Sequence, residues 1–191
     1  MDSIPRPIVR RGEKVSLGLI LDSDINFIFA SINDPDVKRF LRHPDSMHQY
    51  SDEQKWISNL GTREDTRILS IVKNQDDSII GVIGLHELDF QNGTGYLGYF
   101  LAKEHWNHGY VTEAVSLVID YSFKRMNLRK LHSSAYEPNT GSIRVLQKNG
   151  FREIGRRSKH VFVEGHGYVD EILFELFNPD MLDKRRSGKI D

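Results

Sequence analysis

The sequence contains no cysteine. This absence excludes disulfide bonds, thiolate zinc sites and a thiol nucleophile. Long apolar runs are also missing, since the longest, residues 15–21, is interrupted by Ser16 and Gly18 and is too short to span a bilayer. The first fourteen residues lack the apolar core of a signal peptide. We therefore expect a cytoplasmic protein that has no membrane partner.

Neither sign of charge dominates, because 26 Lys and Arg face 27 Asp and Glu for a net charge of -1. Such a balance leaves no electrostatic footprint for nucleic acid, which we do not expect as a partner. The 191 residues are enough for one domain with its own core. We predict this domain over residues 1–178 and a polar, basic tail over residues 179–191. We interpret the basic run 184–186 primarily as part of a solvated tail, and a contact patch is the alternative interpretation.

Apolar periodicity and turn signals predict alternating strands and helices. The clearest helix follows Gly109, with Val111, Ala114, Val115 and Val118 at three- and four-residue steps. Strands are expected at residues 15–21, 68–72, 79–88, 96–101, 130–136, 158–163 and 169–177, and further helices at residues 25–32, 51–61 and 139–149. This order predicts an α/β (α+β) fold in which helices flank a mixed, mostly antiparallel sheet.

The loop before the clearest helix is a candidate anion site. Backbone N–H groups of such a loop and the partial positive charge of the helix N-terminus together suit a phosphate or pyrophosphate. Gly109 would allow a close approach of the ligand and a positive φ. One glycine before a helix is more often ordinary turn geometry, however, and the sequence has neither a P-loop nor a G-x-G-x-x-G motif.

Three segments in a fixed order make this region more specific. The stretches YLGYFLA (residues 96–102), WNHGYVTEA (106–114) and EPNTGSIRVLQKNGF (137–151) resemble the Gcn5-related N-acetyltransferases (GNAT), most closely the branch of RimJ and RimL, which acetylate ribosomal-protein N-termini. The resemblance implies a single GNAT domain that takes acetyl-CoA as donor and needs no metal. It also implies an amine acceptor, either a protein N-terminus or a small molecule, and a possible homodimer. Without cysteine, the amine would attack directly in a ternary complex.

The resemblance assigns the coenzyme A site. In this family the strand at residues 96–101 bulges and splays from the next strand, the coenzyme lies in the gap, and an N–H near Leu101 stabilises the developing oxyanion. The loop 106–111 matches the pyrophosphate loop, although Trp106 and Val111 depart from its usual Q/R-x-x-G-x-G/A pattern. Asn139 is also a natural helix cap. The implied cofactor residues are Phe100, Leu101, Ala102, Trp106, Asn107, His108, Gly109, Tyr110, Val111, Thr112, Asn139, Ser142 and Lys148.

Two catalytic positions of the family are altered. Leu146 stands where many members have a tyrosine that protonates the leaving thiolate, and Tyr96 stands where this branch often has a glutamate. Ser142 is therefore our candidate donor to the sulfur. The candidate bases are Glu87 and Asp170. His86, Glu171 and a water relay to bulk solvent are further candidates for the same role.

Strand alternation gives these bases an expected orientation. It predicts that Glu87 shares a face with Ile83 and Leu85, whereas His86 shares the opposite face with Val82 and Leu88. Asp170 would share a face with Ile172 and Phe174, where an apolar wall would raise the pKa of its carboxyl. A solvated strand end or a structural hydrogen-bond acceptor is the simpler reading of each carboxylate.

Two alternatives stay open, a catalytically weak coenzyme A-binding or sensing module and a ribosome- or peptide-associated protein recruited by the basic tail. We expect residues 25–60 and the loop 164–168 to line the acceptor side, with a mixed set of side chains that does not identify the acceptor. The set is Arg39, Arg42, His43, His48, Tyr50, Trp56 and His166.

Overall fold

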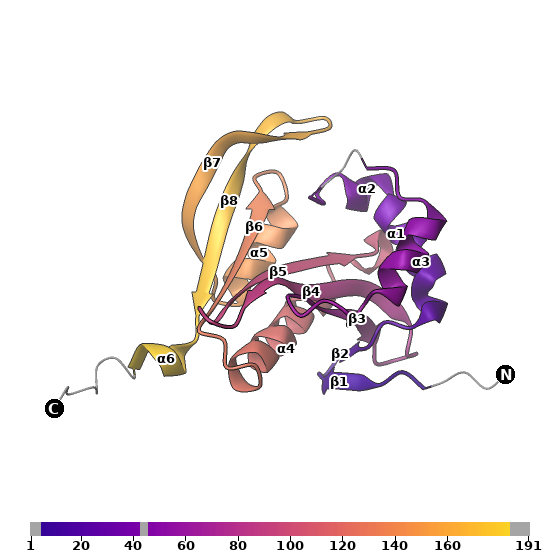
Figure 1. The fold of residues 1–191 in the computed structure, drawn as a ribbon. Helices are drawn as coiled ribbons and strands as arrows, with labels where there is room; N and C mark the ends of the chain where they lie inside the picture. Colours follow the sequence, from indigo (N-terminus) through magenta and orange to yellow (C-terminus); the bar gives the residue numbers. More distant parts are fainter. Residues whose placement is uncertain (1–4, 43–45, 184–191) are drawn as a thin grey trace.

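The computed structural model describes residues 5–42 and 46–183, so His43 and the basic run 184–186 lie outside the described part. One eight-stranded sheet runs through the molecule in the order β1-β2-β3-β4-β5-β6-β8-β7 (Figure 1). The strands are β1 Ile8–Arg11, β2 Val15–Gly18, β3 Arg67–Lys73, β4 Ile79–Asp89, β5 Thr94–Leu101, β6 Lys130–Tyr136, β7 Arg152–Val163 and β8 Gly167–Phe177. Every pair is antiparallel except β5 with β6. The predicted fold class is confirmed.

Helices cover both faces of this sheet. They are α1 Ile25–Asn33, α2 Pro35–Lys38, α3 Tyr50–Ser58, α4 Tyr110–Lys124, α5 Thr140–Lys148 and α6 Pro179–Asp183, the last falling within the predicted tail. Two adjacent residues of β4, Val82 and Ile83, point to opposite faces of the sheet and belong to different core clusters. Ile83 belongs to the main core under α4 and α5, whereas Val82 belongs to a second core under α1 and α3. In the described part, no helix has the length and apolar character needed to cross a membrane.

The first strand escaped prediction, because four residues beside two prolines carry little periodicity. Arg6 anchors this segment, and its guanidinium binds both carboxylate oxygens of buried Asp24 at 2.6 Å. Long-range pairing with β2 then completes the strand. The strand expected from residue 158 also begins earlier, at Arg152, since its exposed and charged first half lacks an apolar pattern.

The expected splay is present between β5 and β6. The two strands pair only from Thr94 to Tyr96 against Lys130 to His132, and then they diverge. The register irregularity of the neighbouring β4–β5 pair, however, lies in β4, where one extra residue is accommodated between His86 and Asp89. The prediction of a bulge in the strand 96–101 was therefore wrong by one strand, since the irregularity lies in β4.

This irregularity also changes the orientation of Glu87. The residue has a φ of 51°, which belongs to the left-handed region. Leu88 consequently packs in the main core with Ile83 and Leu85, and Glu87 is exposed. The predicted faces of Glu87 and Leu88 were wrong, because simple alternation does not continue through a bulge.

Candidate active site

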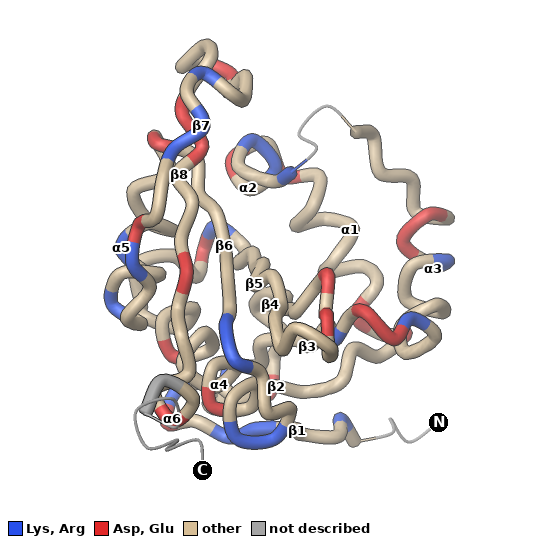
Figure 2. Tube along the Cα trace, turned by 60° about the vertical axis from the view of Figure 1, so that its left-hand side comes forward, with Lys and Arg blue, Asp and Glu red and all other residues tan. Residues whose placement is uncertain are grey.

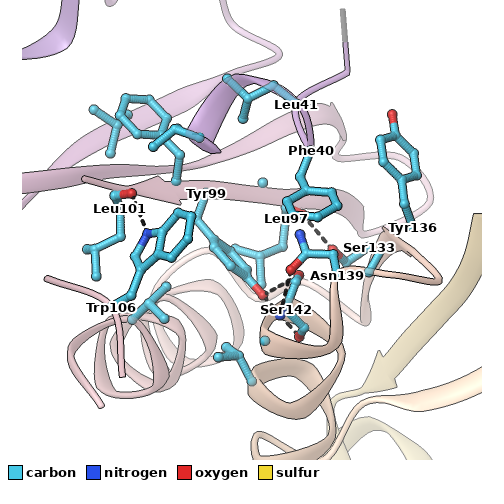
Figure 3. Close-up of a pocket in the computed structure, with 18 of the residues that line it drawn as sticks. Phe40, Leu41, Leu97, Tyr99, Leu101, Trp106, Ser133, Tyr136, Asn139 and Ser142 are labelled. Carbon is cyan, nitrogen blue, oxygen red and sulfur yellow. Dashed lines mark hydrogen bonds between the residues drawn. The ribbon is translucent and has the colours of Figure 1, made fainter. Parts of the chain in front are cut away.

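A cavity of about 780 Å³ lies where β5 and β6 diverge. It is bordered by the N-terminus of α4, the first turns of α5 and the chain that follows α2. Figure 3 shows how side chains from these separate elements converge on it. All the cofactor residues expected from the sequence line this cavity, except Ala102 and His108. Ala102 is instead buried, and the His108 ring stacks on Tyr110.

The loop before α4 presents its backbone to the cavity. Asn107 and Gly109 have φ values of 63° and 81°, and Gly109 directly precedes the first helical residue. Left-handed residues in such a loop can turn successive N–H groups toward one anion. The indole of Trp106 donates to the Leu101 carbonyl at 2.8 Å and ties the loop to the end of β5 (Figure 3). The predicted need for a positive φ at Gly109 is confirmed.

Lys14 is a neighbour of this loop that the sequence did not reveal. The Glu113 carboxylate accepts the backbone N–H of Lys14 at 3.0 Å and also that of Glu13. A Cβ on Gly12 would lie 2.4 Å from the same carboxylate, so the glycine permits this approach. A Cβ on Gly109 would lie 3.8 Å from Lys14 Nζ, which places the ammonium beside the loop. No local motif signals a contact between residues about a hundred positions apart.

Ser142 sits at the start of α5 and has two partners. Its backbone N–H donates to Asn139 Oδ1 at 3.1 Å, which confirms Asn139 as the helix cap. Its hydroxyl lies 3.0 Å from the hydroxyl of Tyr99 on β5 (Figure 3). Burial raises the pKa of Tyr99 to about 12, with the Ser142 hydrogen bond acting in the opposite direction. Tyr99 therefore stays neutral, while Leu146 is fully buried in the core.

His86 lines the cavity from the floor of the sheet. Gly84 and Gly98 are register partners, and a Cβ on either would lie 3.4–3.5 Å from His86 Nε2. The imidazole thus lies over the backbone of these two glycines, within van der Waals range of both positions. Burial first, and then the positive charge of Arg42, lower the pKa of His86. Its ring is therefore neutral at pH 7, which is the protonation state that a general base requires.

The two carboxylates expected as bases lie elsewhere. Neither Glu87 nor Asp170 is among the described residues that line the cavity. Glu87 Oε1 accepts from Arg42 at 3.0 Å, and Asp170 Oδ1 accepts the backbone N–H of Lys159 at 2.9 Å. Glu171 is buried on the other face of β8, where it pairs with Arg157 at 2.9 Å.

The end of the cavity opposite α4 is mainly apolar. Trp56, Ile68 and Val82 form part of its wall, and the Arg42 guanidinium lies 4.7 Å from the Tyr96 ring centre. Segment 25–60 therefore contributes to the lining as expected, whereas the loop 164–168 does not. Of the acceptor-side set expected from the sequence, the described residues that line the cavity are Arg42 and Trp56.

Comparisons with known proteins identify the family and the fold. Residues 16–152 match the family model described as acetyltransferase (GNAT) domain. The SPbeta prophage-derived uncharacterized N-acetyltransferase YokL of Bacillus subtilis (strain 168) is 30% identical over 85% of this chain and 89% of its own. A spermidine N-acetyltransferase from Vibrio cholerae, solved with CoA and spermine, superposes with a TM-score of 0.79 at 20% identity over 90% and 99% of the chains. A ribosomal-protein-S5-alanine acetyltransferase from Vibrio fischeri gives 0.75 at 24% identity over 89% and 96%.

Proposed function

The chain belongs to the GNAT acetyltransferase family, and we propose how its residues move an acetyl group from acetyl-CoA to an amine. The enzyme class expected from the sequence, an acetyl-CoA-dependent N-acetyltransferase, is confirmed by this membership. The observation that carries the proposal is a single cavity that joins the backbone loop before α4 to the imidazole of His86.

The phosphates of acetyl-CoA are proposed to bind at the loop 106–109 and the first turn of α4. The dipole of this fifteen-residue helix favours an anion at that end. Lys14 adds a positive charge beside Gly109, and Lys148 adds another from the last turn of α5. The pantetheine arm would then follow the gap between β5 and β6 past Asn139.

The thioester would lie between the end of β5 and the start of α5. We assign polarisation of its carbonyl to a backbone N–H near Leu101, in line with the resemblance. When the amine nitrogen forms its bond to the carbonyl carbon, the C–S bond breaks and a thiolate leaves. Ser142, held by the neutral hydroxyl of Tyr99, would donate a hydrogen bond to that sulfur. In this proposal, Ser142 and Tyr99 together take over the role of the usual family tyrosine, whose position is occupied here by Leu146.

The proton of the attacking amine goes to His86 in this proposal. Two observations support this choice: the imidazole lines the cavity, and it is neutral, as a general base must be. Glu87 and Asp170 remain predicted alternatives, which would act through water because neither lines the cavity.

The acceptor is proposed to be a peptide N-terminus or a small-molecule amine. The likeness to the RimJ/RimL branch and to the S5-alanine acetyltransferase supports the first, and the likeness to the spermidine N-acetyltransferase supports the second. We call the end of the cavity opposite α4, which Arg42, Trp56, Ile68 and Val82 help to line, the acceptor half. A coenzyme A-binding module without turnover is not favoured, because it would need no neutral imidazole in the same cavity.

Thermal unfolding with and without acetyl-CoA, followed by CoA release in the presence of amines, tests the proposal. A ligand of the folded state raises the midpoint once its concentration exceeds the Kd. We expect such a shift for the wild type and for Gly165→Glu, and its loss in Gly109→Glu. The two glycines have φ values of 80° and 81°, so they carry similar backbone strain, but only Gly109 lines the cavity. An equal shift in both variants, or none in the wild type, would contradict the assignment.

A further inference from the structure

We propose that the natural acceptor is a weakly basic α-amine attached to an apolar group, and that polycations are poor acceptors. This inference rests on the proposed function and narrows the substrate class of the same cavity. Three features carry it: the charges around the cavity, its apolar wall, and the environment of the proton-accepting site.

Carboxylates are scarce where a polycation would need them. Among the described residues that line the cavity, the single Asp or Glu is Asp36. Its carboxylate is already bound by the guanidinium of Arg39 and the ammonium of Lys103. Figure 2 shows that β5, the central strand of the cavity, carries no charged residue. A second or third ammonium group of the acceptor would therefore lose water without finding an unpaired anion.

The charge that does line the acceptor half is positive. Arg42 lies over Tyr96, and its ion-pair partner Glu87 stands outside the lining. The side chains of Arg42 and Glu87 are both more than half exposed, so solvent weakens this pair. The described lining of this half therefore offers an additional cation a guanidinium and no unpaired carboxylate.

An apolar substituent fits the remaining surface. Trp56 comes from α3, Ile68 from β3 and Val82 from β4, and all three belong to the core cluster beneath α1 and α3. Phe100 packs against the same cluster, and Leu41 is a further apolar residue of the lining. Burying an apolar side chain there stabilises the complex by removing hydrocarbon from water.

The attacking nitrogen must be neutral, and the site penalises positive charge. The causes that lower the pKa of His86, burial and the Arg42 charge, act in the same direction on a bound ammonium group. An α-amine has a pKa of about 7.7–8.0, compared with about 10.4 for a lysine-like alkylamine. At pH 7 the α-amine is therefore roughly 250-fold richer in its neutral form. This difference favours α-amines where no carboxylate holds the protonated form.

Rates of CoA release with four acceptors test the inference: phenylalanine amide, serine amide, phenethylamine and spermidine. Phenylalanine amide combines the α-amine with an apolar group, and each other compound lacks one or both features. We expect its kcat/KM to exceed that of serine amide about tenfold and that of spermidine about 100-fold at pH 7, with phenethylamine between these limits. Spermidine or phenethylamine at or above phenylalanine amide would overturn the inference.

Arg42→Glu isolates the contribution of charge. It replaces the cation of the acceptor half with a second carboxylate next to Glu87, so we expect the spermidine to phenylalanine amide ratio to rise about tenfold. Lys124→Glu, a change of the same charge on the exposed end of α4, should leave the ratio unchanged. An unchanged ratio in Arg42→Glu would overturn the charge argument.

The two levels of proposal fail in different ways. If none of the four amines is acetylated while acetyl-CoA still stabilises the fold, this inference is wrong and the cofactor site stands. If acetyl-CoA neither binds nor releases CoA, the proposed function fails first.

Discussion

The two ends of the cavity are built in different ways. The cofactor end comes mainly from one continuous stretch, residues 99–112, joined by the first turns of α5. The acceptor end takes side chains from separate segments: the chain after α2, α3, β3, β4, β5 and β6. At the cofactor end the groups proposed to bind are largely backbone N–H groups, whereas at the acceptor end they are side chains.

This difference predicts that substitutions at the two ends act on different steps. Trp106 departs from the family pattern of the pyrophosphate loop, yet its indole supports the loop through the Leu101 carbonyl. In the branch that the sequence resembles, the position of Tyr96 often holds a glutamate, so one expected carboxylate base is replaced at the acceptor end. We therefore expect substitutions of the groups proposed to act in the transfer step, His86, Tyr99 and Ser142, to lower kcat. Substitutions of the other groups at the cofactor end should act on acetyl-CoA binding, and the predictions follow in order of size.

The largest effect should come from His86→Ala. Loss of the proposed base should lower kcat about 100-fold and leave the Kd of acetyl-CoA, measured by thermal shift, unchanged. His132→Ala is the matched control, because burial also lowers the pKa of His132 and its ring contacts Tyr96, but it does not line the cavity. Equal losses in both variants would show that His86 acts through packing.

Tyr99→Phe should have the next largest effect, since it joins the two ends. Removing its hydroxyl frees the Ser142 hydroxyl 3.0 Å away and should lower kcat about tenfold, as expected for one hydrogen bond. Ser142→Ala should cost as much, and the double variant should cost little more than either alone, because the pair acts as one unit. Fully additive losses in steady-state kinetics would argue against a shared role.

A smaller effect is expected for Lys14→Gln at the cofactor end. Loss of one exposed charge near the phosphates should raise the KM for acetyl-CoA about fivefold without changing kcat. The difference from wild type should shrink as salt is added. Lys124→Gln removes a charge from the opposite end of α4 and should change neither constant. A fall in kcat instead would mean that Lys14 has a structural role.

The smallest effect should be a shift in the pH dependence of kcat/KM when Arg42 is replaced by Gln. Because burial and Arg42 lower the pKa of His86, the imidazole gains a proton only below its ordinary value of 6.5. Activity should therefore be lost as the pH falls through that lowered pKa. Arg42→Gln removes one cause, so the acidic limb of kcat/KM should move to higher pH. A limb that moves to lower pH in this variant would contradict the assignment of His86.

Much of the fold followed from local patterns. The apolar steps after Gly109 predicted α4, and alternation predicted the central strands, because burial imposes these periods on the sequence. Prediction failed where a long-range contact was the cause. The strand β1 depends on pairing with β2 and on the Arg6–Asp24 ion pair, neither of which leaves a periodic signal.

The loop that we propose binds the cofactor was predicted from the sequence by itself, because a glycine, a helix start and two further motifs lie in fixed order along a continuous chain. The tertiary structure alone decided which side chains meet across the cavity. A bulge turned Glu87 outward, the pairing of β4 with β5 placed His86 over Gly84 and Gly98, and Glu113 brought Lys14 to Gly109. Each of these depends on residues that are distant in sequence, and such packing is determined only when the sheet assembles.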